Sequence, residues 1–252
     1  MMDNGSNETI YSIFWLYKVA PEWRRLEAFE RAHLREAFAR TLEERAGSLT
    51  LRGAYSLVGL RHDADLMLWL HGPDLGAAQD LAVALRKTGL GTYLENTYTY
   101  TGIVPISRYA PEHRPAFVQG RPPLRYLSMY PFVKTPEWYL LPFERRRALM
   151  AEHGRMGQRH SAIPEAVIEE ENAGPAVAVA APPHGAVLAN TVHSFGLGDQ
   201  EFVVAFESDD PATIARMVED LRAAEVRRYT AADTPIFLGH RKDLPAALDD
   251  LG

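Results

Sequence analysis

Residues Asp63–Gly89 read DADLMLWLHGPDLGAAQDLAVALRKTG, and residues Gly198–Glu225 read GDQEFVVAFESDDPATIARMVEDLRAAE. Each stretch contains a short apolar strand, a helix start marked by Asp and Pro, and a helix with periodically spaced apolar residues. The two stretches are separated by about half of the chain, which favours duplication of one structural module. Two unrelated α+β domains are the alternative interpretation.

The rest of the chain gives the same order of elements around both stretches. The pattern predicts β-α-β-β-α-β twice, so the predicted fold class is α+β with tandem ferredoxin-like modules. In the first predicted helix, Leu26, Phe29, His33 and Phe38 share one face. Strands are expected at 11–18, 49–58, 65–70, 92–104, 124–133, 188–197, 200–207 and 226–238, and helices at 22–46, 73–87, 142–159 and 210–224.

Two proline-rich stretches suggest how the chain is divided. Residues 109–123 (YAPEHRPAFVQGRPP) have the composition of a linker. They separate an N-terminal module, 1–108, from a C-terminal module, 124–252. Residues 161–187 are rich in Ala, Glu and Pro and lack periodicity, which predicts a long loop inserted into the second module.

Composition excludes several classes of function. The chain of 252 residues is 46% hydrophobic and has a net charge of −6, which argues against nucleic acid as a partner. It has no cysteine, so thiolate catalysis, iron–sulfur clusters and covalent attachment of haem are excluded. The first residues do not resemble a signal peptide, and no apolar run is long enough to span a membrane. We therefore expect a cytoplasmic enzyme.

Candidate chemistry is concentrated between Arg125 and Gln158. His153 shares the apolar face of a predicted helix with Leu149, Met150 and Met156. Taken alone, it is more readily interpreted as a core histidine bonded to a carbonyl group. The functional interpretation is an axial iron ligand, because neutral imidazole suits haem iron and an apolar wall suits a porphyrin face. Tyr130, Lys134 and Trp138 have equally ordinary structural explanations when each is considered separately.

The spacing of these residues is specific when they are taken together. The string YPFVKxxxWYLLPxxxR (130–146), followed by MxEHG (150–154), resembles the coproheme decarboxylases of the chlorite dismutase superfamily, and the actinobacterial type most of all. The stretches ANTVxSFGLGDxEFxxAFE (189–207) and AEVR…PIFLG (224–239) also resemble this family. The resemblance covers most of the chain but not the loop at 161–187.

The resemblance implies a fold and a reaction. The implied fold is two ferredoxin-like modules of the dimeric α+β barrel type, with haem in the second module, and the implied assembly is a homopentamer. The implied reaction consumes hydrogen peroxide and converts iron coproporphyrin III into haem b. Two propionates are lost in sequence as carbon dioxide, through a tyrosyl radical.

The resemblance also assigns roles to individual residues. His153 corresponds to the proximal iron ligand, and Tyr130 to the tyrosine that forms the radical. His113 corresponds to the distal base that takes a proton from peroxide. Lys134 corresponds to a cation beside the reacting propionates, and Trp138 to a residue lining the pocket. Since the substrate carries four carboxylates, further cations are expected around the pocket, and the candidates are Arg125, Arg114 and Arg227.

Ala189 is the position where chlorite dismutases carry a distal arginine, so the resemblance argues against efficient chlorite decomposition. Three other functions remain open. The chain is another haem enzyme of the superfamily (a chlorite dismutase or a peroxidase), a haem-binding protein without turnover, or a structural oligomer without a cofactor. Tyr130 and His113 favour catalysis over binding alone, because binding does not require a phenol that forms a radical.

Overall fold

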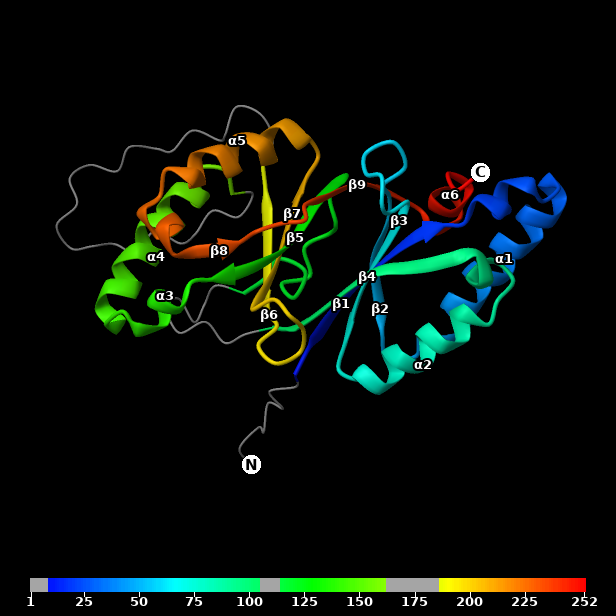
Figure 1. Cartoon of the computed structure of the whole chain (residues 1–252), viewed down its shortest axis with the longest axis horizontal. Helices are drawn as coiled ribbons and strands as arrows, with labels where there is room; N and C mark the ends of the chain where they lie inside the picture. Colours follow the sequence, from blue (N-terminus) through cyan, green and yellow to red (C-terminus); the bar gives the residue numbers. More distant parts are fainter. Residues whose placement is uncertain (1–8, 105–113, 162–185) are drawn as a thin grey trace.

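The computed structural model describes residues 9–104, 114–161 and 186–252 (Figure 1). Among these residues no helix combines the length and the apolar character needed to cross a membrane. The first half contains β1 (Tyr11–Val19), η1 (Pro21–Arg25), α1 (Ala28–Arg45), β2 (Thr50–Ser56), β3 (Leu66–Gly72), α2 (Leu75–Arg86), η2 (Leu90–Tyr93) and β4 (Leu94–Ile103). The second half contains β5 (Tyr126–Lys134), α3 (Pro136–Leu140), α4 (Phe143–Gln158), β6 (Leu188–His193), β7 (Phe202–Ser208), α5 (Pro211–Arg222), η3 (Glu225–Tyr229), β8 (Thr230–Ala232), β9 (Phe237–Lys242) and α6 (Leu244–Asp249).

The two halves have the same topology, which confirms the predicted tandem ferredoxin-like fold. Strands of the first half pair antiparallel in the order β4-β1-β3-β2. In the second half β6, β7 and β5 pair in the equivalent order, and both β8 and β9 pair with β5. The first β-α-β-β-α-β unit and the second therefore present the strand order of a ferredoxin-like sheet.

The duplication extends to the first turn of the matching helices. Asp74 caps α2 and accepts a hydrogen bond from the Gly76 backbone at 2.7 Å. Asp210 caps α5 and accepts one from the Ala212 backbone at 2.9 Å. Their backbone angles are nearly identical, with φ/ψ of −130/113° and −127/112°. Each aspartate satisfies a backbone N–H that the helix itself leaves without a partner.

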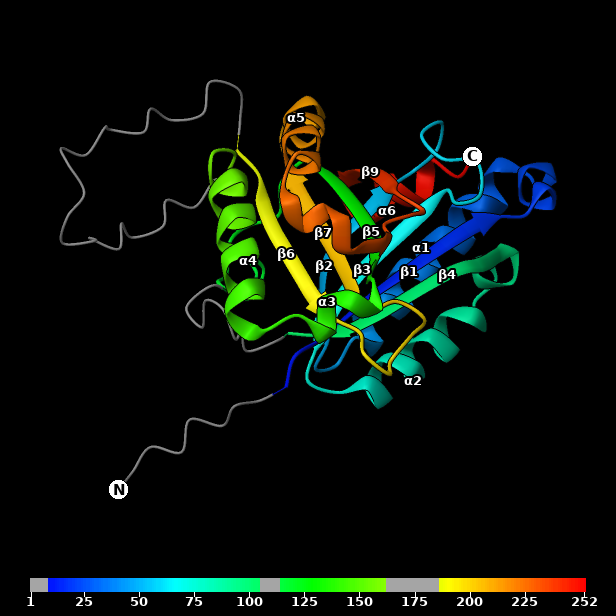
Figure 2. The same ribbon diagram turned by 60° about the vertical axis from the view of Figure 1, so that its left-hand side comes forward.

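The two sheets face each other across a shared apolar interior, and the helices cover their outer faces (Figures 1 and 2). Strand alternation explains this arrangement, because every second side chain of a strand points to the same face. The interior between the sheets contains Phe14, Tyr55, Trp69, Leu127, Met129, Val203 and Phe237. On the outer face of the first sheet, α1 and α2 bury Phe38, Leu42, Leu81 and Leu85 against Trp15 and Leu68.

The sheets are joined at two edges, so the hydrogen-bonded strands form a closed circuit. One junction is a single pair between β4 and β6, Ile103 with His193. The other joins β2 to β9, where Ala54–Ser56 pairs with residues 240–242. The last helix, α6, then crosses to the first half, and Leu244, Leu248 and Leu251 are buried in the same core as α1 and α2.

Two predicted elements differ in kind from the structure, and two short helices were not predicted. The helix expected over 22–46 is divided into η1 and α1, because Leu26 and Glu27 adopt extended conformations between them. The expected shared face of Phe29 and Phe38 is wrong, because both belong to α1 and a spacing of nine residues places them on opposite sides of the helix. Phe38 is accordingly buried, whereas Phe29 is 78% exposed. The strand expected over 226–238 consists of η3, β8 and β9, and the short helices α3 and α6 were not expected.

Candidate functional site

The site is organised by the alternation of side chains along β5. Leu127 and Met129 face the interior between the two sheets. Tyr130 and Phe132 pack on the opposite, outer face, against the apolar cluster beneath α5. Lys134 has the same parity as these two residues and lies at the end of the strand. Two residues of the predicted site, Tyr130 and Lys134, therefore belong to one face of one strand.

Tyr130 is held by apolar neighbours. Its ring meets Phe206 of β7 edge to face, with 6.1 Å between the ring centres. Burial raises the pKa of the Tyr130 phenol above its ordinary value, Arg222 and Arg227 lower it, and Asp233 raises it further. The phenol is therefore protonated at neutral pH, so it retains the hydrogen atom that a radical mechanism would require.

Lys134 is a buried cation surrounded by aromatic rings. Its ammonium group lies 4.4 Å from the centre of the Trp138 ring and 5.1 Å from that of Phe132. Within the described part of the chain, no carboxylate lies within ion-pairing distance of it. Burial and the neighbouring Arg227 lower the pKa of Lys134 to about 8, while Glu201 acts in the opposite direction. The ammonium group would thus gain from a carboxylate supplied by a ligand.

Glu201 supports this end of β5 through the backbone. Its carboxylate accepts hydrogen bonds from the Lys134 backbone N–H at 2.7 Å and from the Tyr139 hydroxyl at 2.6 Å. These bonds attach β5 to α3, which also carries Trp138. Trp138 is 4% exposed and packs with Leu149 of α4, so α3 links the end of the strand to the helix of His153.

His153 lies on α4 as a neutral imidazole. Burial, followed by the charge of Lys134, lowers the pKa of His153 to about 4. Its Nδ1 atom is buried and has no hydrogen-bond partner among the described residues. The described residues therefore do not provide the carbonyl group that a core histidine would be expected to bond at Nδ1. A neutral ring beside a cation suits a metal ligand, because the lone pair is free at physiological pH.

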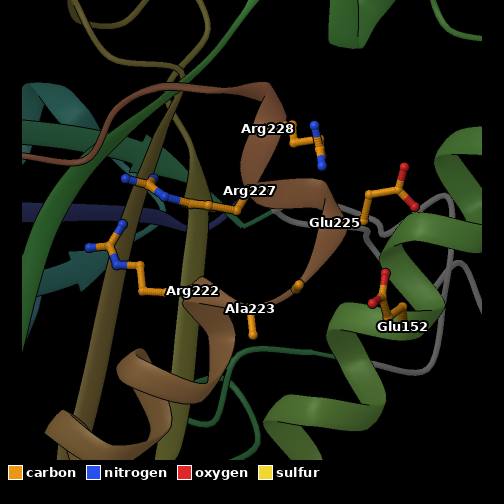
Figure 3. Close-up of a pocket in the computed structure, with 7 residues that line it drawn as sticks. Glu152, Arg222, Ala223, Glu225, Arg227 and Arg228 are labelled. Atoms are coloured by element: carbon orange, nitrogen blue, oxygen red, sulfur yellow. The ribbon is translucent and has the colours of Figure 1, made fainter.

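Two arginines extend the positive charge toward Tyr130. Arg222 at the end of α5 and Arg227 in η3 both form ion pairs with Asp233, the latter at 3.1 Å. Both side chains point away from α4, toward the strands, whereas Arg228 lies on the other side of η3 (Figure 3). A cleft of about 410 Å³ lies here, lined by Glu152, Arg222, Ala223, Ala224, Glu225, Arg227 and Arg228.

These residues fit an iron porphyrin that carries carboxylates. His153 offers a ring nitrogen to iron, and Trp138 and Tyr130 offer apolar surface. Lys134, Arg222 and Arg227 offer positive charge at one side. A structural oligomer without a ligand would not need a buried ammonium group that has no carboxylate partner within residues 9–104, 114–161 and 186–252.

The structure brings together five of the predicted site residues: Tyr130, Lys134, Trp138, His153 and Arg227. Ala189 is close to them, because it packs on the same apolar cluster as Tyr130. Arg125 is not among them, since it precedes β5 at the end opposite Lys134 and contacts His240 and Tyr126. Arg114 is exposed, ahead of the buried Ala116 and Phe117. His113 lies outside the described residues.

Sequence reasoning missed Arg222. The only signal was its position five residues before Arg227, at the end of a predicted helix, where a cation is commonly explained by the helix dipole. Asp233, which pairs with both arginines, was read as part of a strand. Neither residue could be assigned before the course of the chain through η3 and β8 was known.

Comparison with known proteins places these observations in a family. The chlorite dismutase family model matches residues 31–169 and 178–242. The chain is 33% identical over 237 residues to the coproheme decarboxylase of Mycolicibacterium smegmatis, covering 93% of this chain and 91% of that protein. It is 23% identical to the coproheme decarboxylase of Staphylococcus carnosus, covering 91% and 88%.

Solved structures support the same fold. Chlorite dismutase from Candidatus Nitrospira defluvii in complex with imidazole superposes with a TM-score of 0.79. The match covers 96% of this chain and 94% of that one, at 22% identity. The family match over most of the chain and the shared architecture lead to one conclusion: this chain belongs to the chlorite dismutase family.

Proposed function

We propose that this chain is a coproheme decarboxylase, an enzyme that oxidatively removes two propionates of iron coproporphyrin III to give haem b. The observation that carries the proposal is the shared face of Tyr130 and Lys134 on β5, with the neutral His153 near Lys134. The relatives from Mycolicibacterium smegmatis and Staphylococcus carnosus, both coproheme decarboxylases, support the substrate.

The side chains have separate tasks in this proposal. His153 binds the iron of the substrate through its imidazole, which burial keeps neutral. Lys134, with Arg222 and Arg227, binds carboxylates of the substrate and orients the propionates that react. Trp138 packs against the Lys134 ammonium group and limits its movement. The bound iron porphyrin supplies the oxidising chemistry once an oxidant is present.

Tyr130 is the proposed relay that carries a hydrogen atom from the propionate to the oxidant-activated pigment. Because its phenol is protonated and enclosed by Phe206 and the α5 cluster, loss of an electron would be accompanied by loss of its proton. The resulting tyrosyl radical would take a hydrogen atom from the propionate β-carbon. The propionate would then lose carbon dioxide and give its second electron to the oxidant, which leaves a vinyl group, so one molecule of a two-electron oxidant is used for each propionate. His113 is the proposed base that accepts a proton from the oxidant.

Hydrogen peroxide as the oxidant, a homopentameric assembly and a cytoplasmic location remain predictions. Two further proposals concern the organisation of the chain. Residues 1–108 and 124–252 are proposed as the two modules, with 109–123 as the linker and 161–187 as an insertion in the second module. Arg114 and Arg125 stay as predicted contributors of charge, although neither lies with the five grouped residues.

One experiment tests the proposal directly. Iron coproporphyrin III is added to the purified protein, hydrogen peroxide is titrated, and the pigment masses are followed. Stepwise loss of two carboxyl groups as carbon dioxide supports the proposal. Bleaching of the pigment without decarboxylation contradicts it. Decomposition of chlorite by the haem-loaded protein, without decarboxylation of coproheme, would favour a chlorite dismutase instead.

A further inference from the structure

A buried ion pair connects the two halves of the molecule. Arg52 of β2 and Glu207 of β7 have side chains that are 6% and 0% exposed. The Arg52 Nη2 atom donates to Glu207 Oε1 at 2.8 Å, and the Nε atom donates to the same oxygen at 3.3 Å. Asn190 of β6 donates its Nδ2 hydrogen to this oxygen at 3.0 Å. We call Arg52, Asn190 and Glu207 the interior cluster.

The interior cluster holds residues 114–124, which we call the connecting segment. The Leu124 backbone N–H donates to Glu207 Oε2 at 3.0 Å, and the Phe117 backbone N–H donates to Asn190 Oδ1 at 2.9 Å. Arg52 also donates to the Arg121 carbonyl. Three polar side chains from three strands therefore bind the connecting segment at three separate points.

The position of the connecting segment matters for the site because it lies along β6. The Ala116 backbone N–H donates to the Ala189 carbonyl at 3.3 Å. The Ala189 side chain faces the opposite way from Asn190 and packs on the apolar cluster that also holds Tyr130. Likewise Phe206, the residue before Glu207, contacts the Tyr130 ring. The interior cluster thus lies behind the strands whose outer faces form the site.

We propose that Arg52, Asn190 and Glu207 are positioning residues, which hold the connecting segment and β6 in the arrangement that the substrate site needs without touching the substrate. The proposal rests on the proposed function only for the effect on the site. The hydrogen bonds from the interior cluster to the connecting segment are present in the protein without a ligand, and their effect is measured separately by amide hydrogen exchange.

One substitution, Glu207→Gln, removes hydrogen bonds of the interior cluster with little change in side-chain size. Every partner that the described residues give the Glu207 carboxylate is a hydrogen-bond donor: two nitrogens of Arg52, the Asn190 amide and the Leu124 backbone. In Glu207→Gln the new amide group is itself a donor, so one oxygen position is lost whichever way it turns. The variant keeps the size of the side chain and loses at least one of these bonds.

The first measurement is amide hydrogen exchange of the protein without porphyrin. In Glu207→Gln we expect exchange at Leu124 to become at least about tenfold faster. In Asn190→Ala, which leaves the ion pair in place, we expect faster exchange at Phe117 and little change at Leu124. Two variants with different local effects keep the test decisive even if Glu207→Gln folds poorly.

Asp65→Asn is the matched control. Asp65 is also buried, accepts from the Lys18 ammonium at 2.8 Å and from the Val19 backbone at 2.9 Å, and makes no contact with the connecting segment. It should change exchange at Val19 and leave Phe117 and Leu124 unchanged. Equal acceleration at Leu124 in Asp65→Asn, or unchanged local exchange in both cluster variants, would overturn the proposed hold.

The second measurement is the dissociation constant for iron coproporphyrin III. Glu207→Gln should weaken binding by about tenfold relative to the wild type, and Asp65→Asn should not. If local exchange rises as expected while affinity stays the same, the cluster does not position the site. If the wild type binds the pigment but never decarboxylates it, the proposed function is wrong. The conclusions about local exchange and about pigment affinity would still hold, because neither measurement depends on turnover.

Discussion

The ammonium group of Lys134 lies 4.4 Å from the centre of the Trp138 ring, in a pocket without a described carboxylate at ion-pairing distance. The attraction between the ring face and the cation offsets only part of the hydration free energy that the ammonium group loses on burial. The lowered pKa of Lys134, about 8, shows that the charged form is disfavoured in the folded protein. Such an arrangement costs stability and favours the binding of a carboxylate.

Lys134→Met should therefore stabilise the ligand-free protein while weakening its affinity for iron coproporphyrin III. At pH 7 we expect a gain in the free energy of unfolding on the order of 2 kcal/mol. Between pH 8 and 10.5 the lysine is protonated in the unfolded chain but largely neutral in the folded protein, so the free energy of unfolding of the wild type should rise with pH. The stability difference between Lys134→Met and the wild type should therefore shrink over this range. Urea unfolding at several pH values measures both effects. Lys18→Met, which removes a cation paired with Asp65, should destabilise the protein.

Tyr130→Phe should bind the substrate normally and fail to turn it over. Only the phenolic oxygen is lost, so packing against Phe206 is preserved. We expect decarboxylation to slow by at least about a hundredfold, as measured by pigment mass after addition of peroxide. Tyr126→Phe is the control, because Tyr126 lies on the same strand but stacks on His240 at the far end. Normal turnover by Tyr130→Phe would contradict the proposed role of Tyr130 as the residue that forms the radical.

Arg222→Gln and Arg227→Gln should each weaken substrate binding by about tenfold, through loss of a charge-assisted bond to a carboxylate. Arg40→Gln is a control with the same change in net charge, since Arg40 is exposed on α1 in the first half of the chain. Titration of the pigment into each variant gives the dissociation constants. A general effect of net charge would reduce affinity equally in all three variants, and that result would contradict the assignment.

His153→Leu should change the acid stability of the ligand-free protein. The pKa of His153 is about 4 in the folded state and ordinarily near 6.5, so the unfolded chain binds more protons between these values. Wild-type stability therefore falls as the pH is lowered from 6.5 to 4, and this contribution should be missing from His153→Leu. In the presence of iron coproporphyrin III, the variant should also show a different ferric spectrum. An unchanged spectrum would exclude His153 as the iron ligand.

The described residues on either side of the proposed insertion lead us to predict that residues 162–185 are dispensable for folding. Ser161 pairs with Val187 in a parallel bridge, and the Val187 backbone donates to the His160 carbonyl at 2.7 Å. His160 also pairs with Asp220 at 2.7 Å, which attaches the end of α4 to α5. Replacing residues 162–185 by about four Gly and Ser residues should leave the thermal midpoint within about 3 °C of the wild type. Loss of cooperative unfolding would show that the core depends on this segment.

Local patterns were sufficient to predict most of the fold. The Asp residues at 74 and 210 indicated the helix starts, and both cap helices in the structure. The final strand was wrong because periodicity alone does not show where a chain leaves a sheet. Pro235 cannot donate a backbone hydrogen bond, and the chain leaves the sheet after β8 and returns as β9.

The site was predictable only in part, for a related reason. Tyr130 and Lys134 are four residues apart on one strand, so strand alternation alone places them on one face. The ion pair of Arg52 with Glu207 joins residues 155 positions apart in the sequence, and no local pattern indicates it. The direction of the Arg222 side chain could not be predicted either. Arg222 can contribute charge to the site only because its side chain points from α5 toward the strands.

The crossing of α6 to the first half also constrains how the molecule is made. Leu244, Leu248 and Leu251 complete the core that α1 and α2 form on the first sheet. During synthesis this core has no cover at one side until residues 244–251 have left the ribosome. The core of the first half is therefore completed only after the second half has been translated. Fragments ending near residue 124 should expose apolar surface and aggregate.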